Sequence, residues 1–298
     1  MDAQRPPVCD YEGSEYQANF WDQGGREYED RVEAVALRRL LPGSGRLLLE
    51  LGAGAGRNTP RYQGFQQIVL LDYSLSQLRQ AQQRLGSSQR YIYVAADVYR
   101  LPLAPGLFDA ATMIRTLHHL KDPVCALSQV RQVLQAGAVF ILEFANKHNL
   151  KAILRYGLGK QSWSPFSLEP VEFAELNFDF HPRLVRDWLF QSGFKVERQL
   201  AVSHFRLGWL KRILPLDLLV KMDSLAQWSG RWWQLTPSVF IRASAQGEAS
   251  QKPQDAFFRC PECAYLPLED ARDRLICPSC GRIWALRDGI YDFRQPAG

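Results

Sequence analysis

The sequence predicts an α/β fold in which helices cover both faces of a parallel sheet, followed by a small second domain. Between Arg46 and Phe144, short apolar runs alternate with helical patterns, which is typical of strand–helix–strand units. Near the C-terminus, four cysteines form two Cys-x-x-Cys pairs, a spacing that indicates a bound metal rather than a disulfide framework. A chain of 298 residues is long enough for one ordinary domain and such an appendage.

The composition is that of a globular protein. Hydrophobic residues make up 46% and charged residues 22%, which excludes a disordered or fibrous chain. Residues 150–235 carry 12 basic and 8 acidic side chains, so most of the net charge of +5 lies in the middle of the chain. We expect a cytoplasmic protein, because no leader-like apolar stretch opens the sequence and no apolar run approaches the roughly 20 residues of a membrane span.

The elements of the first block follow from their periodicity. A helix is expected from Arg26 to Leu41, ended by Pro42-Gly43. Two more helices are expected between strands, because each places apolar residues on one face: Leu75, Leu78, Ala81 and Leu85 in one, and Val124, Leu127, Val130 and Leu134 in the other. The expected strands are Arg46–Glu50, Gln67–Asp72, Ile92–Ala95, Phe108–Ile114 and Gly137–Phe144.

The second half of the predicted large domain, residues 1–245, is less regular. The stretch 146–180 lacks clean periodicity, and we interpret it as an insertion over the sheet edge. A helix at Pro182–Gln191 and strands at Lys195–Ser203 and Ser238–Ser244 are expected around a second insertion, the tryptophan-rich stretch 207–236. Residues 246–256 are typical of a linker, and residues 257–298 form the predicted second domain.

The strand that ends at Glu50 runs into a turn with glycines at 52, 54 and 56. Glycine lets the backbone bend sharply and approach a ligand closely. The next strand ends in Asp72, 18 residues after Gly54, where a carboxylate can accept hydrogen bonds from ribose hydroxyls. Arg57 stands where a dinucleotide site needs a third glycine, so a nicotinamide or flavin fits less well, although glycines plus acid leave that alternative open.

Two further features of the sequence narrow the choice of cofactor. The third strand leads into Asp97-Val98, and the fourth leads into a segment from Arg115 to Leu120 that contains two histidines. With these motifs in this order, the chain resembles class I S-adenosylmethionine-dependent methyltransferases, in particular the branch with quinone-biosynthesis and other small-molecule enzymes. The resemblance implies a Rossmann-like, seven-stranded methyltransferase sheet. It also implies a cofactor site made by Glu50, Gly52, Ala53, Gly54 and Gly56 at the methionine part, Asp72 at the ribose, Asp97 and Val98 at the adenine, Arg115 beside the sulfonium, and Tyr73.

A sulfonium methyl group is already electrophilic, so an enzyme mainly has to align the acceptor atom and exclude water. Where that atom carries a proton, a base helps, and His118 and His119 lie just past the fourth strand. The alternative is that both histidines are structural. No Asn/Asp-Pro-Pro-Tyr/Phe sequence occurs at this position, which argues against enzymes that methylate the amino groups of DNA adenine or release-factor glutamine.

The walls of the acceptor pocket are expected from Tyr16 to Tyr28 and from the two insertions, which would act as a substrate cap. Their aromatic and apolar residues suit a lipophilic or planar small molecule. The alternative is that the tryptophans at 209, 228, 232 and 233 only pack the cap. The stretch 207–236 also suits peripheral contact with a membrane surface, because basic residues punctuate it.

The four paired cysteines predict a zinc ribbon. Cys260 and Cys263 are separated by 13 residues from Cys277 and Cys280, which suits a closed four-thiolate Zn²⁺ site with a structural role, while a redox role is the alternative. This segment and its tail 284–293 resemble the small zinc-ribbon activator subunit of tRNA, rRNA and release-factor methyltransferases. That activator stabilises its partner by adding to the sheet. The 13 residues leave no room for the helical insert of such activators, so its binding surfaces do not transfer wholesale.

Three functions compete at this level. The first is methyl transfer to a small acceptor at oxygen, carbon or nitrogen. The second is tRNA or rRNA methylation, supported by the activator-like ribbon, although the sequence has no dense basic stripe for tracking phosphates. A non-catalytic binding module is disfavoured because the cofactor motifs are intact. Nothing in the sequence implies an obligate partner subunit.

Overall fold

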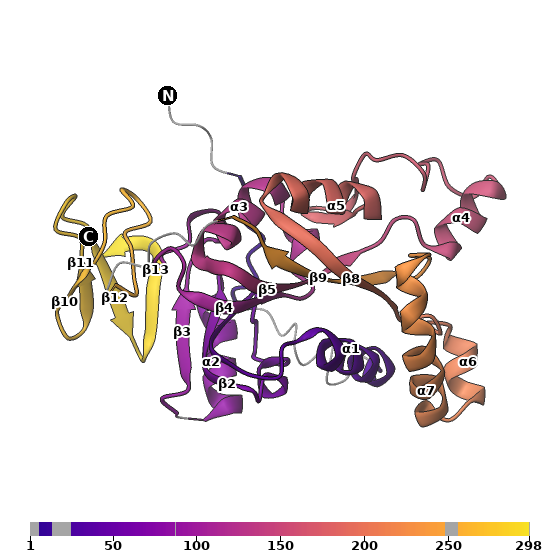
Figure 1. Ribbon diagram of the computed structural model, residues 1–298, viewed down its shortest axis with the longest axis horizontal. Helices are drawn as coiled ribbons and strands as arrows, with labels where there is room; N and C mark the ends of the chain where they lie inside the picture. Colours follow the sequence, from indigo (N-terminus) through magenta and orange to yellow (C-terminus); the bar gives the residue numbers. More distant parts are fainter. Residues whose placement is uncertain (1–5, 14–24, 87, 248–255, 298) are drawn as a thin grey trace.

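The computed structural model describes residues 6–13, 25–86, 88–247 and 256–297 (Figure 1). One sheet of 11 strands runs through it in the order β10-β11-β12-β13-β3-β2-β1-β4-β5-β9-β8. The five central strands, in the order β3-β2-β1-β4-β5, run parallel to one another, whereas β9 is antiparallel to both β5 and β8. The mixed α/β, Rossmann-like fold is confirmed.

The seven predicted strands are all present, with ends that differ from the predicted ones by at most three residues. They are β1 (Gly45–Leu51), β2 (Phe65–Asp72), β3 (Tyr91–Ala95), β4 (Phe108–Met113), β5 (Leu134–Ala145), β8 (Phe194–Val202) and β9 (Ser238–Ala245). The early strands were predictable because a parallel strand that is buried on both faces has an almost continuous apolar sequence.

Helices pack on both faces of this sheet, and alternate residues of β1 show how the core divides. Leu47 and Leu49 belong to one buried cluster with α3 (Pro123–Val133) and α5 (Pro182–Gln191), whereas Leu48 belongs to another. That second cluster contains residues of α1 (Glu27–Leu40), α2 (Leu75–Leu85) and α7 (Leu216–Ala226). In Figure 1, α5 and α1 accordingly lie on opposite sides of the strands.

The boundary between α3 and β5 differs from the prediction in an instructive way. Leu134 matches the apolar face of the preceding helix, but it is the first residue of β5 and pairs with Phe108. The helix ends at Val133, which is buried in the core beside Leu127 and Val130. An apolar residue at the helical spacing can belong to the last turn of a helix or to the first position of a buried strand. The apolar pattern therefore placed Leu134 on the helix, one residue too far.

The two insertions are more regular than their sequences predict. The first forms α4 (Leu150–Gly157) and a hairpin of β6 (Val171–Ala174) and β7 (Asn177–Asp179). The second forms α6 (Gly208–Ile213), α7 and the 3-10 helix η5 (Gln227–Arg231). Shorter 3-10 turns are η2 (Thr59–Arg61), η3 (Val98–Arg100) and η4 (Leu117–His119). Among the described residues, none of the helices has the length and apolar character to cross a bilayer.

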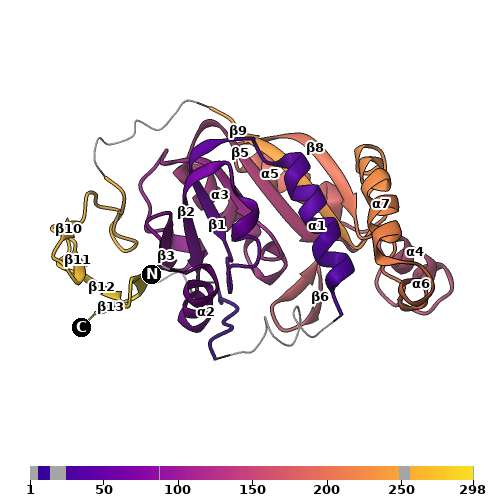
Figure 2. The same cartoon turned by 90° about the horizontal axis from the view of Figure 1, so that it is seen from below.

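The C-terminal segment continues the main sheet. Its strands are β10 (Glu269–Asp270), β11 (Arg274–Ile276), β12 (Ile283–Arg287) and β13 (Ile290–Ala297). β13 lies parallel to β3, with Ile290 opposite Tyr93, and Trp284 and Phe293 are buried in the same cluster as β1. Figure 2 shows these strands at one end of the molecule. The division into two domains therefore remains an interpretation of the sequence, and most of the predicted linker lies outside the described residues.

Candidate active site and metal centre

The glycine turn lies at the carboxyl end of β1. Gly52 and Gly54 have φ angles of 65° and 53°, a left-handed conformation that other residues rarely adopt. A Cβ atom on Gly52 would lie only 2.0 Å from the side-chain oxygen of Thr116. The amide of Gly54 donates a 2.8 Å hydrogen bond to the carboxylate of Asp72 at the end of β2. The turn and the acid are therefore joined directly.

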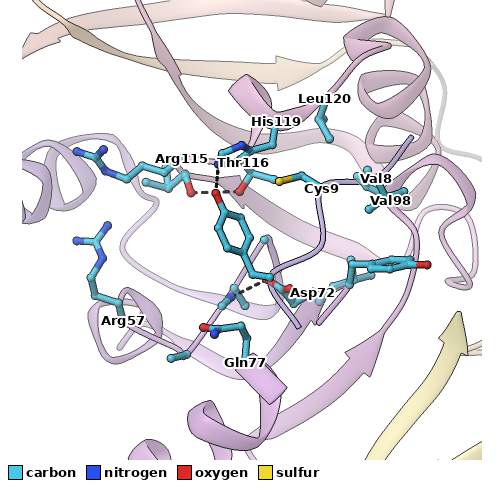
Figure 3. Close-up of a pocket in the computed structure, with 18 of the residues that line it drawn as sticks. Val8, Cys9, Arg57, Asp72, Gln77, Val98, Arg115, Thr116, His119 and Leu120 are labelled. Carbon is cyan, nitrogen blue, oxygen red and sulfur yellow. Dashed lines mark hydrogen bonds between the residues drawn. The ribbon is translucent and has the colours of Figure 1, made fainter. Parts of the chain in front are cut away.

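A cavity of about 140 Å³ lies over these strand ends (Figure 3). Most of the predicted cofactor residues line it: Gly52, Ala53, Gly54, Asp72, Tyr73, Val98 and Arg115. Gly56 does not, because its position faces α2, where an added Cβ would contact Leu85 and Ala81. This glycine therefore permits close packing of the turn against the helix. The assignment of the lining residues to parts of the cofactor remains a prediction.

Two acidic residues that were predicted at the cofactor, Glu50 and Asp97, hydrogen-bond to neighbouring protein groups and do not line the cavity. The carboxylate of Glu50 accepts hydrogen bonds from the hydroxyls of Thr59 at 2.6 Å and Tyr62 at 3.1 Å, and burial raises its pKa to about 7. Asp97 caps η3 by accepting from the amide of Tyr99 at 2.9 Å. Neither lines the cavity. In this structure both acids stabilise the turns that follow β1 and β3, a role that short sequence motifs do not separate from ligand binding.

Arg115 occupies a constrained position after β4. Its φ angle is 55°, and its amide donates a 2.9 Å hydrogen bond to the buried carboxylate of Glu143 on β5. Its guanidinium forms an ion pair with Glu33 of α1, which also pairs with Arg57 at 2.8 Å. Burial alone would raise the pKa of Glu33, but the charges of Arg115 and Arg57 outweigh it and lower the pKa to about 2. The ion pairs of Glu33 with Arg115 and Arg57 hold α1 beside the cavity.

The N-terminal segment contributes residues that the sequence did not single out. Val8, Cys9 and Tyr11 line the cavity, and the hydroxyl of Tyr11 lies 3.2 Å from Nε2 of His119. Farther along, the amide of Gly13 donates a 2.9 Å hydrogen bond to Ser76 on α2. The predicted wall runs from Tyr16 to Tyr28; residues 14–24 lie outside the described part of the chain, and of the rest Arg26 lines a second cavity. No motif marks residues 6–13, because their role depends on where the chain crosses the sheet.

The two histidines have different surroundings. His119 lines the first cavity and also a second one, and its Nδ1 lies 3.1 Å from the carbonyl of Leu176. A carbonyl only accepts, so Nδ1 carries the proton and Nε2 is left with its lone pair. His118 lines only the second cavity, and its Nδ1 has no hydrogen-bond partner among the described residues. Burial lowers the pKa of both rings, so both are neutral near pH 7.

The second cavity has a volume of about 360 Å³ and adjoins the first at Tyr11, Arg115 and His119. Charged side chains on its walls come from Arg26, Glu143, Asp179 and Arg206. Amides of Asn146, Asn149 and Asn177 add to the polar lining, and Phe173 and Pro237 are apolar. Burial raises the pKa of Asp179 to about 6, although the charges of Arg206 and Lys147 oppose this.

The tryptophans were expected to wall the acceptor pocket or to pack its cap. Instead, all four have exposed fractions between 43% and 67%, and none lines either cavity. The first insertion does line the second cavity, through Asn149, Phe173 and Asp179. From the second insertion only its flanks, Arg206 and Pro237, reach it.

The four C-terminal cysteines form a compact cluster. Their sulfur atoms all lie within 4.8 Å of one another, with 3.7 Å between Cys260 and Cys280 and 3.5 Å between Cys263 and Cys277. Sulfur atoms at the corners of a tetrahedron with metal–sulfur bonds of about 2.3 Å are about 3.8 Å apart. Four thiols at this spacing can hold a metal ion, and they leave no coordination position open for a substrate.

Comparisons with known proteins agree with this geometry. The profile of a methyltransferase-domain family matches residues 49–142. An O-methyltransferase of Penicillium expansum is 26% identical over 205 residues, which cover 63% of this chain and 68% of the fungal enzyme. A demethylmenaquinone methyltransferase of Chlamydia trachomatis is 37% identical over 97 residues, which cover 30% of this chain and only 40% of the chlamydial enzyme.

A similar solved structure is a chain from the complex between the Haloferax volcanii Trm112 methyltransferase activator and a methyltransferase. The TM-score is 0.55 at 15% identity, with 78% of this chain and 96% of that chain covered. At this identity the likeness establishes a shared fold.

Proposed function

We propose that the chain uses residues 49–142, which match a methyltransferase-domain family, to transfer a methyl group from S-adenosylmethionine to an oxygen atom of a small lipophilic or aromatic acceptor. The observation that carries the proposal is the junction of the two cavities. Tyr11, Arg115 and His119 line both of them, so a donor in the first and an acceptor in the second would meet at these residues. The enzyme would therefore bring its substrates together between β4 and the N-terminal segment.

In this proposal the residues of the first cavity hold the donor. When bound, S-adenosylmethionine supplies an electrophilic methyl group. Asp72 would accept hydrogen bonds from the ribose hydroxyls, and the amides of the glycine turn would hold the methionine part. Asp72 already accepts from the amides of Gly54 at 2.8 Å and Ser74 at 3.0 Å, which aim its carboxylate. A carboxylate has about four acceptor positions, so it keeps acceptor capacity for the ligand beside these backbone bonds.

The residues at the junction handle the proton of the acceptor. Nε2 of His119 carries the lone pair and accepts from the hydroxyl of Tyr11 at 3.2 Å, so it can take the proton of an attacking hydroxyl through Tyr11, or directly when the acceptor displaces the Tyr11 hydroxyl. The carbonyl of Leu176 then supports the imidazolium ring that results. Burial lowers the pKa of His119, which keeps the ring unprotonated and able to act as a base at neutral pH.

Two facts support the acceptor class. The relatives include enzymes that are named O-methyltransferases. The second cavity, at about 360 Å³, falls in the size range of small-molecule sites, which is about 300–1,000 Å³. Its polar walls suit the reacting end of such a molecule, with Arg206 and Asp179 as its partners. A lipophilic remainder would extend toward α4, whose N-cap, Asn149, lies on the cavity wall.

We further propose that the cysteine cluster binds Zn²⁺ in a structural role. The metal would fasten the loops that carry Cys260 and Cys277, and so hold β11 to β13 against β3. The same sheet addition supports the alternative function, tRNA or rRNA methylation, because the activator that this segment resembles also adds to the sheet of its partner.

Calorimetric titration with S-adenosylhomocysteine tests the donor site. Asp72→Ala should weaken binding at least about tenfold, since hydrogen bonds to a charged acceptor contribute about 1.5–3 kcal/mol each. The matched control is Asp109→Ala. Asp109 also accepts from two backbone amides, those of Arg46 at 2.7 Å and Leu47 at 2.8 Å, but does not line the cavity. The control should lose stability and keep binding.

The acceptor is then sought with a labelled methyl donor. Phenols and hydroxylated lipids are compared with tRNA and rRNA, using the wild type and His119→Gln. Label on a small hydroxyl compound that depends on His119 supports the proposal, whereas label on RNA alone selects the alternative. If the folded, zinc-loaded protein fails to bind S-adenosylhomocysteine, the assignment of the first cavity is wrong.

A further inference from the structure

Exposed apolar side chains are concentrated in one part of the chain. Of the 19 large hydrophobic residues that are exposed among the described residues, 18 lie between Leu150 and Leu235, and the other is Tyr265. A protein normally scatters such residues singly over its surface, and a concentration marks a surface that another molecule covers. The exposed residues of this stretch lie in the two insertions for the most part.

The insertions meet at one end of the molecule. Figures 1 and 2, which are related by a 90° turn, both place α4, α6 and α7 at the end of the long axis opposite the C-terminal strands. We call residues 150–168 and 207–235 the apolar end. Because two segments far apart in the sequence contribute to it, the apolar end is a broad face rather than a single helix.

The side chains of the apolar end are large and stand out into solvent. On α4 and its cap, Leu150, Leu154 and Leu158 follow one another at intervals of four, so they share one side of the helix. Leu158 is 68% exposed. In the second insertion, Trp209 is 60% and Ile213 is 69% exposed. Tryptophan prefers the boundary between water and hydrocarbon, and apolar side chains such as leucine form the inserted face of helices that lie in that boundary.

Basic side chains surround these residues. Six are exposed within the apolar end: Lys151, Arg155, Lys160, Arg212, Lys221 and Arg231. The exposed acid there is Asp217, which pairs with Arg31 of α1 at 2.5 Å. Long basic side chains can lay their stems along an apolar surface while their charges remain in the headgroup layer. The face is thus complementary to an anionic lipid surface.

The apolar end borders the second cavity. Asn149, on the cavity wall, is the N-cap of α4, and Arg206, also on the wall, directly precedes the second insertion. A molecule that enters the second cavity between the two insertions would therefore come from whatever surface the apolar end contacts.

We propose that the apolar end docks on a bilayer that contains anionic lipids. Two other occupants fit less well. A second copy of the chain would bring two sets of like charges together, which costs energy. RNA would use the basic residues but would leave leucine and isoleucine side chains such as Leu158 and Ile213 uncovered. The proposal goes beyond methyl transfer, and it stands whether or not the acceptor is a lipid.

The test is flotation of the full-length protein with vesicles of phosphatidylcholine, with and without an equal part of phosphatidylglycerol. The wild type should float with the mixed vesicles and bind the neutral ones more weakly. Leu154→Glu and Trp209→Glu should each weaken binding at least about tenfold, because each removes a buried apolar group from the contact. Lys151→Glu should weaken binding to the mixed vesicles at least about fivefold and change binding to the neutral ones little.

Tyr265→Glu provides the matched control, because it removes an exposed aromatic residue that lies far outside the apolar end, in the C-terminal segment. It should float like the wild type. Thermal unfolding of every variant checks that the fold is retained. We expect it to be retained, because the substituted side chains are exposed. Failure of the wild type to float with mixed vesicles overturns the proposal, as does equal flotation of Leu154→Glu and Trp209→Glu. A dimer or an RNA complex formed through the apolar end, without flotation, also overturns it.

Discussion

Replacing Glu33 by glutamine removes the buried carboxylate that pairs with Arg115 and Arg57. Glu33 is fully buried on α1, and its Oε2 accepts a 2.8 Å hydrogen bond from Arg57. Glutamine has nearly the same shape but no charge, so Arg115 and Arg57 lose the anionic partner that they share, while Arg57 keeps its ion pair with Asp30. The substitution therefore tests whether this ion-paired cluster, rather than packing, holds α1 against the cofactor cavity.

The pKa of Glu33 gives the magnitude. Each tenfold change in proton affinity corresponds to about 1.4 kcal/mol, so a pKa lowered from 4.5 to about 2 corresponds to about 3 kcal/mol of stability. Because the folded-state pKa is the lower one, this contribution is present above pH 4.5 and is lost as the pH falls toward 2. At pH 3 about 1.4 kcal/mol of it remains. The variant itself has no such dependence.

Urea unfolding of the wild type and Glu33→Gln measures the difference. We expect about 3 kcal/mol at pH 7 and about half of that at pH 3. Glu27→Gln, on the same helix, is the control, because its 3.8 Å pair with Arg31 is exposed and should contribute less than about 1 kcal/mol. A difference that is the same at both pH values, or an equal loss in the control, would refute the electrostatic explanation.

Three further outcomes are expected. His119→Gln should lower kcat about 100-fold in the methyl-transfer assay. In the same assay, wild-type activity should stay level near pH 6.5 and fall only at lower pH, because burial lowers the pKa of His119. Metal analysis should find one zinc ion per chain, and Cys277→Ser should remove it and lower the melting temperature. Gly230→Ala should cost about 1–3 kcal/mol in a denaturant titration, because its Cβ would lie 2.3 Å from the amide nitrogen of Ala201, while Gly157→Ala, in open space, should not.

The predictions that held best depend on short stretches of sequence. The glycine turn and Asp72 were predicted at the ends of consecutive strands, and in the structure the Gly54–Asp72 hydrogen bond joins them, because parallel strands end at the same edge of a sheet. The cysteine pairs were expected to converge because each Cys-x-x-Cys forms its own tight loop. Glu50 and Asp97 lie at the ends of β1 and β3 and accept from Thr59 and Tyr99, while their assignment to the cofactor stays a prediction, since a carboxylate at a strand end can cap a turn as readily as it can bind a ligand.

The sequence by itself determined the order of strands and helices, the glycine turn with its acid, and the four-thiol cluster, because in each case the residues that interact are close in the chain or fixed by a repeating pattern. Only the tertiary structure decided that Tyr11 meets His119 across 108 residues, that Glu33 holds Arg115, and that β13 extends the sheet beyond β3. It also left the tryptophans exposed rather than lining the acceptor pocket. These contacts depend on how distant segments pack, and local periodicity carries no information about which surfaces of two distant segments will face each other.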